Sequence, residues 1–289
     1  MARRERNWRS SATAVALVVA AVAAAALIAA APPPPAGVPF GPWHLPAERL
    51  AAPFTGTQLG LHPEDAVPRL EAARRAGFRV FVRLALSRRR FSGPDGSFDL
   101  ERWKREIDRF RGIDFAPYVS DGTLLGHFLF DEPHDPTNWN GRPVPFAVIE
   151  STAAYSKRLW PTLPTGVGSP PSFLAGGAPW GALDFAETQY RPQKGDLSGW
   201  IAREVAAARA TRLGTLFSLN VLDGNGRGKP LTGAQLEQFG TVLAREPTAC
   251  ALLLWKYDPA YFSRDDVWAA VAAIATAAGH AAASCVMHR

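Results

Sequence analysis

Residues 124–133 read Leu-Leu-Gly-His-Phe-Leu-Phe-Asp-Glu-Pro, and this stretch decides the fold. A short, almost wholly apolar run bounded by turn residues is typical of a strand buried on both faces, as in parallel sheets. Pro133 cannot donate a ladder hydrogen bond, so we expect the strand to end there. Asp131 and Glu132 then lie at the carboxyl end of a buried strand, where α/β barrels place their active sites.

The segments around this strand alternate between strand-like and helix-like patterns. Further strands are predicted at 55–61, 79–86, 163–167, 183–190, 215–222 and 250–257. Helices are predicted at 63–76, 99–110, 145–160, 195–210, 232–245 and 264–278, the second of them with Asp99 as its N-cap. This alternation predicts an α/β fold with a parallel sheet, and the chain length favours a (β/α)8 TIM barrel over an open sheet.

One strand of that barrel is missing from the prediction. Seven strands are clear, whereas a TIM barrel has eight. The eighth could lie near residues 113–119, or the barrel could be incomplete. Residues 32–53 are rich in proline and aromatic side chains, and we interpret them as a tether and irregular lead-in. The barrel domain is therefore expected to span residues 54–289.

The N-terminal segment has the pattern of a targeting sequence. A basic stretch, 1–10, precedes an apolar run from Ala12 to Ala31, and four prolines follow. Residues 1–31 are predicted to be either a cleaved signal peptide or an uncleaved membrane anchor, since the run is just long enough to span a bilayer. The arginines before the run would keep the N-terminus inside. We therefore expect an extracytoplasmic protein, secreted or anchored to the cell membrane by this segment.

Charge and cysteine content narrow the function further. The formal net charge is +6, but arginines in the first ten residues supply part of it. The remaining balance is too weak to predict a nucleic-acid partner. Cys250 and Cys285 are the two cysteines of the chain, and in an oxidising compartment such an isolated pair predicts a disulfide. The alternative is two unrelated buried thiols.

Polar side chains follow several predicted strands, and in a barrel these strand ends converge on one mouth. The candidate acids are Asp131, Glu132 and Glu187. The candidate substrate contacts are Arg83, Trp139, Gln189, Tyr190, Asn220, Trp255 and Lys256. Cleavage of a glycosidic bond requires paired carboxylates, because one acid protonates the leaving oxygen while the other attacks the anomeric carbon or activates water. Aromatic rings stack on sugar faces, and Trp139, in a loop, is expected to be exposed for such a contact.

The segment 126–133 resembles the acid/base strand of clan-A-type glycoside hydrolases, which are TIM barrels. Those proteins usually carry Asn-Glu-Pro, and Asp131 replaces the asparagine. The segment is also similar to exported bacterial proteins with a glycosidase-like barrel. The resemblance implies that Glu132 is the acid/base and that Trp255 forms a subsite floor. Because successive strand residues point to opposite faces, Asp131 is expected to orient Glu132 rather than share its proton.

The chain departs from that family at the second carboxylate. The family places a nucleophilic glutamate at the end of a later strand, but the predicted strand 215–222 offers Asn220 and, in a turn-like Asp-Gly-Asn-Gly segment, Asp223. Glu187 on the preceding strand is the alternative nucleophile. If neither acid serves, the barrel would bind glycans without cleaving them. Glu132 could also be a structural partner of Arg83 or Lys256.

A metal-dependent hydrolase is the remaining alternative. His127, Asp131, His134 and Asp135 lie close together in the sequence, but their spacing fits no standard zinc pattern. We therefore expect no metal and no cofactor. The expected partners are a carbohydrate substrate and, if the N-terminal segment is retained, the membrane.

Overall fold

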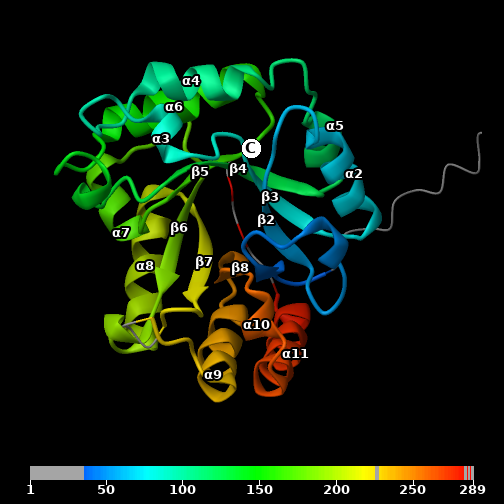
Figure 1. Cartoon of the computed structure of the whole chain (residues 1–289). Helices are drawn as coiled ribbons and strands as arrows, with labels where there is room; N and C mark the ends of the chain where they lie inside the picture. Colours follow the sequence, from blue (N-terminus) through cyan, green and yellow to red (C-terminus); the bar gives the residue numbers. More distant parts are fainter. Residues whose placement is uncertain (1–35, 225–227, 283–284, 286, 288–289) are drawn as a thin grey trace, which may run out of the picture. The chain divides into compact units, whose positions relative to one another are not determined.

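The protein forms a nearly closed barrel of eight parallel strands (Figure 1). The computed structural model describes residues 36–224 and 228–282 together with Cys285 and Met287. The strands are β1 (Phe40–Pro42), β2 (Gly56–Gly60), β3 (Arg79–Arg83), β4 (Leu124–Asp131), β5 (Thr165–Gly168), β6 (Phe185–Tyr190), β7 (Gly214–Asn220) and β8 (Ala249–Trp255). From β2 to β8 each strand pairs with the next strand of the chain, and β1 pairs with β8. An isolated bridge between Trp43 and Gln58 links the β1 and β2 sides. The predicted TIM barrel is confirmed.

The eighth strand lies where the sequence predicted a tether. β1 spans three residues, and Phe40 stands beside Leu252 of β8. So short a strand, ending in proline, carries no hydrophobic period that a sequence pattern can detect. The alternative location near 113–119 is wrong. Residues Ala116–Ser120 form helix α5, which has Pro117 in its first turn.

Helices cover the outside of the barrel. They are α2 (Ala66–Arg75), α3 (Arg88–Phe91), α4 (Leu100–Asp108), α5, α6 (Phe146–Leu159), α7 (Pro171–Leu174), α8 (Leu197–Thr211), α9 (Gly233–Ala244), α10 (Pro259–Phe262) and α11 (Asp265–His280). Four 3-10 turns accompany them: η1 (Ala47–Arg49), η2 (Pro136–Asn138), η3 (Ala175–Gly177) and η4 (Pro192–Lys194). Asp99 caps α4 by accepting a hydrogen bond from the Arg102 backbone nitrogen at 2.9 Å, as predicted.

Two hydrophobic cores support the strands. The larger core lies between the sheet and the helices and includes the fully buried Trp103 and Trp200. The smaller core fills the barrel interior and consists of Trp43, Phe81, Phe128, Phe185, Leu216, Ala251 and Leu253. Gly126 and Gly166 make room in it, because a Cβ atom at either position would collide with the Phe185 ring. The interior below the strand ends is therefore filled mainly by apolar side chains.

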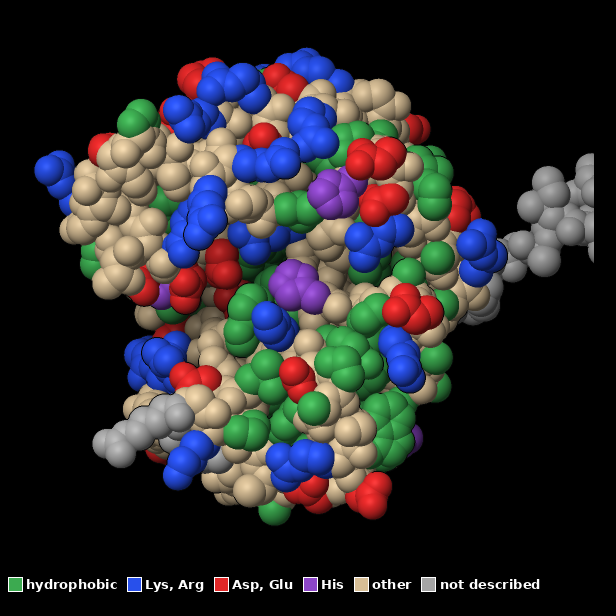
Figure 2. Space-filling view, viewed as in Figure 1, with side chains coloured by type: hydrophobic (Ala, Val, Ile, Leu, Met, Phe, Trp, Pro, Cys, Tyr) green, Lys and Arg blue, Asp and Glu red, His purple; other side chains and the backbone are tan. Residues whose placement is uncertain are grey.

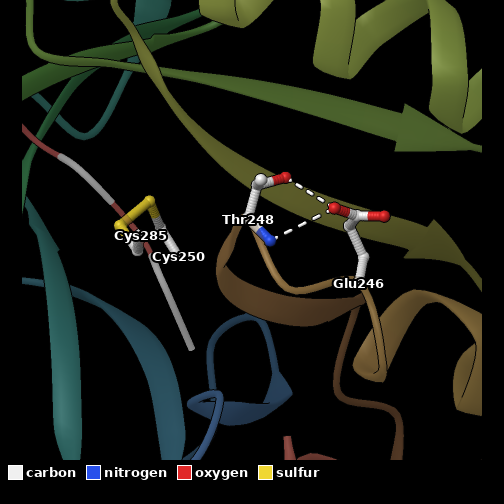
Figure 3. Close-up of a disulfide and its surroundings, with 4 residues drawn as sticks. All are labelled: Glu246, Thr248, Cys250 and Cys285. Carbon is white, nitrogen blue, oxygen red and sulfur yellow. Dashed lines mark hydrogen bonds between the residues drawn. A yellow bond between two sulfur atoms is a disulfide. The ribbon is translucent and has the colours of Figure 1, made fainter. Parts of the chain in front are cut away.

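A disulfide joins Cys250 on β8 to Cys285 in the C-terminal segment, as predicted (Figure 3). Just before β8, the Thr248 hydroxyl and backbone nitrogen both donate to Glu246 Oε1, at 2.8 and 3.1 Å, which fixes the turn that leads into the strand. Two residues beyond Cys285, Met287 packs against the interior core.

The predicted signal or anchor, residues 1–31, lies outside the described residues. Within the part of the chain that the structure describes, no helix has both the length and the apolar character needed to cross a membrane.

Loss of the disulfide should destabilise the barrel. The bond closes a loop with a sequence separation of 35, for which the chain-entropy model gives about 3–4 kcal/mol. We expect Cys285→Ser to lower the free energy of unfolding by about that amount, as measured by denaturant titration. Reduction of the wild-type protein should have the same effect on stability and none on the variant. Equal stability of the oxidised wild type and the variant would contradict the expectation.

Candidate active site

A cavity of about 330 Å³ opens at the carboxyl ends of the strands. Its lining consists of Trp43, Asp131, Glu132, His134, Asp135, Gly168, Pro170, Glu187, Gln189, Arg191, Lys194, Asn220 and Trp255. On the face drawn in Figure 2, acidic and basic side chains gather around a hollow. The site therefore combines carboxyl groups, cations and aromatic rings in one concave surface, as ligand sites do.

Asp131 reaches this cavity because β4 bulges. Phe128 stands opposite Gly166 of β5, whereas Asp131 stands opposite Gly168. Between these two pairs β4 advances by three residues and β5 by two, which is a β-bulge in β4. Phe128 and Asp131 consequently face the interior, although they are an odd number of residues apart. Gly168 is required beside the bulge, because a Cβ atom there would collide with the Asp131 carboxylate.

Glu132 lines the same cavity as Asp131, which corrects the expectation that the two acids point to opposite faces. The residue lies just after β4 in the left-handed region, with φ of 49°, a conformation that costs a non-glycine residue roughly 1–2 kcal/mol. Three hydrogen bonds hold its backbone: its nitrogen donates to the Gly168 carbonyl, and its carbonyl accepts from the Asp135 nitrogen and from Trp139 Nε1. The strand alternation therefore no longer applies to Glu132.

The Glu132 side chain is exposed to solvent. Its Oε2 atom accepts a hydrogen bond of 2.7 Å from Asn138 Nδ2, in the turn η2. The turn is itself fixed by Asp135, whose Oδ1 accepts from the Thr137 backbone nitrogen and hydroxyl. The segment after β4 thus orients the Glu132 carboxyl group.

Glu187, on β6, is the buried acid of the site. It is 6% exposed and lies two residues above Phe185, whose ring belongs to the apolar interior core. Burial and the neighbouring Asp131 carboxylate raise the pKa of Glu187 to about 8, while a hydrogen bond with Ser218 opposes the rise. The free site therefore holds Glu187 mostly protonated at neutral pH.

The Asp131 carboxyl group is subject to burial and to a nearby positive charge, which act on its pKa in opposite directions. Burial raises its pKa to about 6, against the attraction of the Arg83 guanidinium, and the Glu132 carboxylate adds to the rise. At neutral pH Asp131 is mostly ionised, and its negative charge favours the protonated form of Glu187. Burial acts on both Asp131 and Glu187, but the Arg83 guanidinium opposes it only at Asp131, so the pKa of Asp131 rises less than that of Glu187.

Two tryptophans form an aromatic wall. Trp255, at the end of β8, and Trp43, just after β1, meet edge to face with ring centroids 5.6 Å apart. Trp43 Nε1 donates to Ser218 Oγ at 2.9 Å, which ties the ring to the hydroxyl that bonds Glu187. Trp255 remains partly exposed, as a sugar platform would be. His44 also packs on Trp255, with ring centroids 5.8 Å apart.

The predicted substrate contacts divide into two groups. Gln189, Asn220 and Trp255 line the cavity, and Asn220 Nδ2 donates to Gln189 Oε1 at 3.1 Å. Arg83 lines a smaller neighbouring cavity, and Lys256, which is exposed, is absent from the lining of the large one.

Trp139 and Tyr190 differ from expectation. Trp139 is only 2% exposed, because its ring packs among Phe91, Phe98 and Phe130, so the predicted exposure is wrong. It contributes instead to the wall of the smaller cavity. Tyr190 is 2% exposed and packs outside the barrel against Trp200, with its hydroxyl donating to the Gly195 carbonyl at 2.6 Å. Tyr190 therefore does not line the large cavity.

Other sequence alternatives are also resolved by position. Asp223 does not line the cavity; its Oδ1 accepts from the Gly228 nitrogen, as the turn composition indicated. His127 is fully buried in the outer core beside Trp103, with Nδ1 2.8 Å from Ser156 Oγ, so it lies away from Asp131 and His134. The proposed metal cluster is therefore not assembled, and no group of three or more potential ligands occurs within the described residues.

Sequence reasoning missed three aromatic or charged side chains of the cavity. Trp43 was assigned to the lead-in before the barrel, although it directly follows β1. Arg191 and Lys194 follow β6. Extending the search by a few residues beyond each strand end would have found the last two, because barrel sites are built from the loops after the strands. His134 and Asp135, considered above only as metal ligands, also line the cavity.

Comparison with known proteins gives similarity in structure alone. No protein-family model matches the sequence, and no curated protein matches it. A GH18 chitinase from Pseudoalteromonas aurantia is 10% identical, with a TM-score of 0.51 over 82% of this chain and 99% of that chain. A glucosidase from Croceicoccus marinus is 14% identical, with a TM-score of 0.57 over 84% of this chain and 68% of that chain.

Gas2p from Saccharomyces cerevisiae, in complex with laminaritriose and laminaritetraose, is 15% identical, with a TM-score of 0.51 over 87% of this chain and 66% of that chain. At these low identities, the structural similarity establishes the fold and nothing more. The chain is a (β/α)8 barrel that resembles these glycoside hydrolases in structure.

Proposed function

We propose that the protein is a glycoside hydrolase acting on an extracytoplasmic carbohydrate, with Glu187 as proton donor and Glu132 as the second carboxylate. The observation that carries the proposal is a single cavity holding one acid kept protonated by burial and another open to solvent. Glycoside cleavage needs such a pair, because the leaving oxygen must receive a proton while a carboxylate attacks or activates water.

The roles differ from those that the family resemblance implied. A general acid must carry its proton near the working pH, and Glu187 does so with a pKa of about 8. Glu132 is exposed and accepts the Asn138 hydrogen bond, as a carboxylate does. These environments support Glu187 as the acid and Glu132 as the nucleophile or base.

Three further residues complete the proposed site. Asp131 is a positioning residue whose charge keeps the proton on Glu187. Trp255 and Trp43 offer apolar area for a sugar face.

The Cys250–Cys285 disulfide and the targeting pattern of residues 1–31 support an extracytoplasmic location, secreted or membrane-anchored.

The two roles can be separated by the leaving group of the substrate. We expect Glu187→Gln to slow cleavage of an oligosaccharide by about 10²–10⁴-fold, the usual contribution of general acid catalysis. The dinitrophenolate of a dinitrophenyl glycoside departs without a proton, so Glu187→Gln should lower kcat/KM for its cleavage less than about tenfold. Glu132→Gln should slow both substrates by orders of magnitude, since the attacking step is lost. Initial rates over a panel of oligosaccharides and aryl glycosides measure these effects.

Glu237→Gln is the matched control, because Glu237 is an exposed helical residue away from the cavity, and it should leave both rates unchanged. The opposite pattern, with Glu132→Gln spared on the activated substrate, would assign the acid role to Glu132. Full activity of both site variants would overturn the glycosidase proposal. Glycan binding with no cleavage by the wild type would favour the non-catalytic barrel.

The raised pKa of Glu187 predicts a pH dependence of stability. The unfolded chain releases this proton near 4.5, whereas the folded protein holds it to about 8. Between these two pH values the folded state holds a proton that the unfolded state has released. The free energy of unfolding contributed by Glu187 is therefore fully present below pH 4.5 and is lost as the pH rises to about 8. The side chain introduced by Glu187→Gln stays neutral at every pH. At pH 9 we therefore expect the free energy of unfolding of this variant to exceed that of the wild type by about 5 kcal/mol, because each pKa unit is worth about 1.4 kcal/mol.

Denaturant titrations of both proteins at pH 4.5, 7 and 9 measure this difference. The advantage of Glu187→Gln should vanish at pH 4.5, where both side chains are neutral. Glu237→Gln should follow the wild type at every pH. A variant less stable than the wild type at pH 9 would contradict the assigned burial of Glu187.

A further inference from the structure

We propose that the glycan bound at this site carries an anionic substituent, a carboxylate or a sulfate, which Arg83 and Arg88 hold in a small cavity beside the acids. The inference rests on the proposed function and names its substrate class. It follows from the position and volume of that cavity and from the two arginines that line it without an ion-pair partner among the described residues. A neighbouring arginine, Arg90, has such a partner and does not line the cavity.

The small cavity adjoins the candidate active site. It has a volume of about 120 Å³ and is lined by Arg83, Arg88, Phe91, Asp131, Glu132 and Trp139. Asp131 and Glu132 also line the large cavity, so the two acids form a wall shared by both spaces. Since a water molecule takes up about 30 Å³ in the liquid, the volume suits a substituent of a few heavy atoms near the bond to be cleaved.

Arg83 is the inner cation of this cavity. It is the last residue of β3, and its Nε atom donates to the Ala85 carbonyl at 3.2 Å. Among the described residues, no hydrogen bond or ion pair uses its terminal guanidinium nitrogens. The Asp131 carboxylate influences Arg83 electrostatically but forms no ion pair with it. The terminal N–H groups of the Arg83 guanidinium are therefore not bound by Asp131.

Arg88 is the outer cation, at the start of α3. Its guanidinium carbon lies 5.6 Å from the centre of the Trp139 ring, and within the described part of the chain no carboxylate pairs with it. Arg90, two residues later, forms an ion pair of 3.4 Å with Glu106 and does not line the cavity. The run 88–90 therefore contains one arginine committed to α4 and one left open toward the cavity.

The chemistry of the pair points to an oxyanion. A guanidinium presents paired N–H donors that match a carboxylate or sulfate, and such charge-assisted hydrogen bonds are about twice as strong as neutral ones. Arg191 and Lys194, on the other side of the acids, also lack an ion-pair partner in the described residues. A neutral sugar would leave these cations without an anion at ion-pair distance.

The test is a binding experiment with the full chain on an array of carboxylated, sulfated and neutral oligosaccharides, independent of cleavage. We expect the bound glycans to be anionic. Calorimetry with the strongest binder should then give an affinity at least about tenfold lower for Arg88→Gln than for the wild type. Arg90→Gln is the matched control and should bind as the wild type does. Binding to carboxylated or to sulfated glycans identifies which anion the cavity accepts.

Selection of neutral glycans, binding to none, or equal effects of Arg88→Gln and Arg90→Gln would overturn the inference. Hydrolysis is assayed separately on the same glycans. Anion-selective binding without hydrolysis would support the inference and count against the proposed activity, whereas hydrolysis of a neutral glycan would support the activity and overturn the inference.

Discussion

The bulge in β4 is the constraint on which the site depends. By adding one residue between Phe128 and Asp131, it lets an aromatic ring close the barrel interior and a carboxylate enter the cavity above it. Gly168 on β5 accommodates that carboxylate because it has no side chain, and its carbonyl accepts the Glu132 nitrogen. The same few residues thus set the positions of two acids. A regular β4 would turn Asp131 toward the apolar outer core, where burying a charge is costly.

The division of the barrel interior into an apolar floor and a polar mouth creates the difference between the acids. Phe81, Phe128, Phe185 and their neighbours exclude water below the strand ends. Glu187 lies at the boundary, where desolvation disfavours its charged form, whereas Glu132 lies at the rim. Two chemically identical side chains therefore have different environments, because Glu187 is buried within the barrel and Glu132 is exposed beyond the end of β4.

Ion pairs form outside the barrel, whereas two arginines at the mouth have none within the described part of the chain. Arg74, Arg90 and Arg111 lie on the outer helices or in the turn after α4 and have carboxylate partners within 4 Å. Exposed pairs of this kind contribute little to stability, about 0–1 kcal/mol each. Arg83 and Arg88 lack such partners among the described residues and line a cavity beside the acids. Their position at this cavity is the basis of the proposed contact with an anionic substituent.

The sequence by itself determined the alternation of strands and helices, the carboxyl ends that carry polar residues, and the pairing of Cys250 with Cys285. These features follow from local periodicity and from the existence of a single cysteine pair. Tertiary structure alone decided the place of β1, because three residues carry no period, and the burial of Trp139 and Tyr190, because their neighbours come from distant segments. It also brought Asp131 and Glu132 into one cavity, since a bulge and a left-handed residue depend on contacts with β5 that strand alternation cannot express.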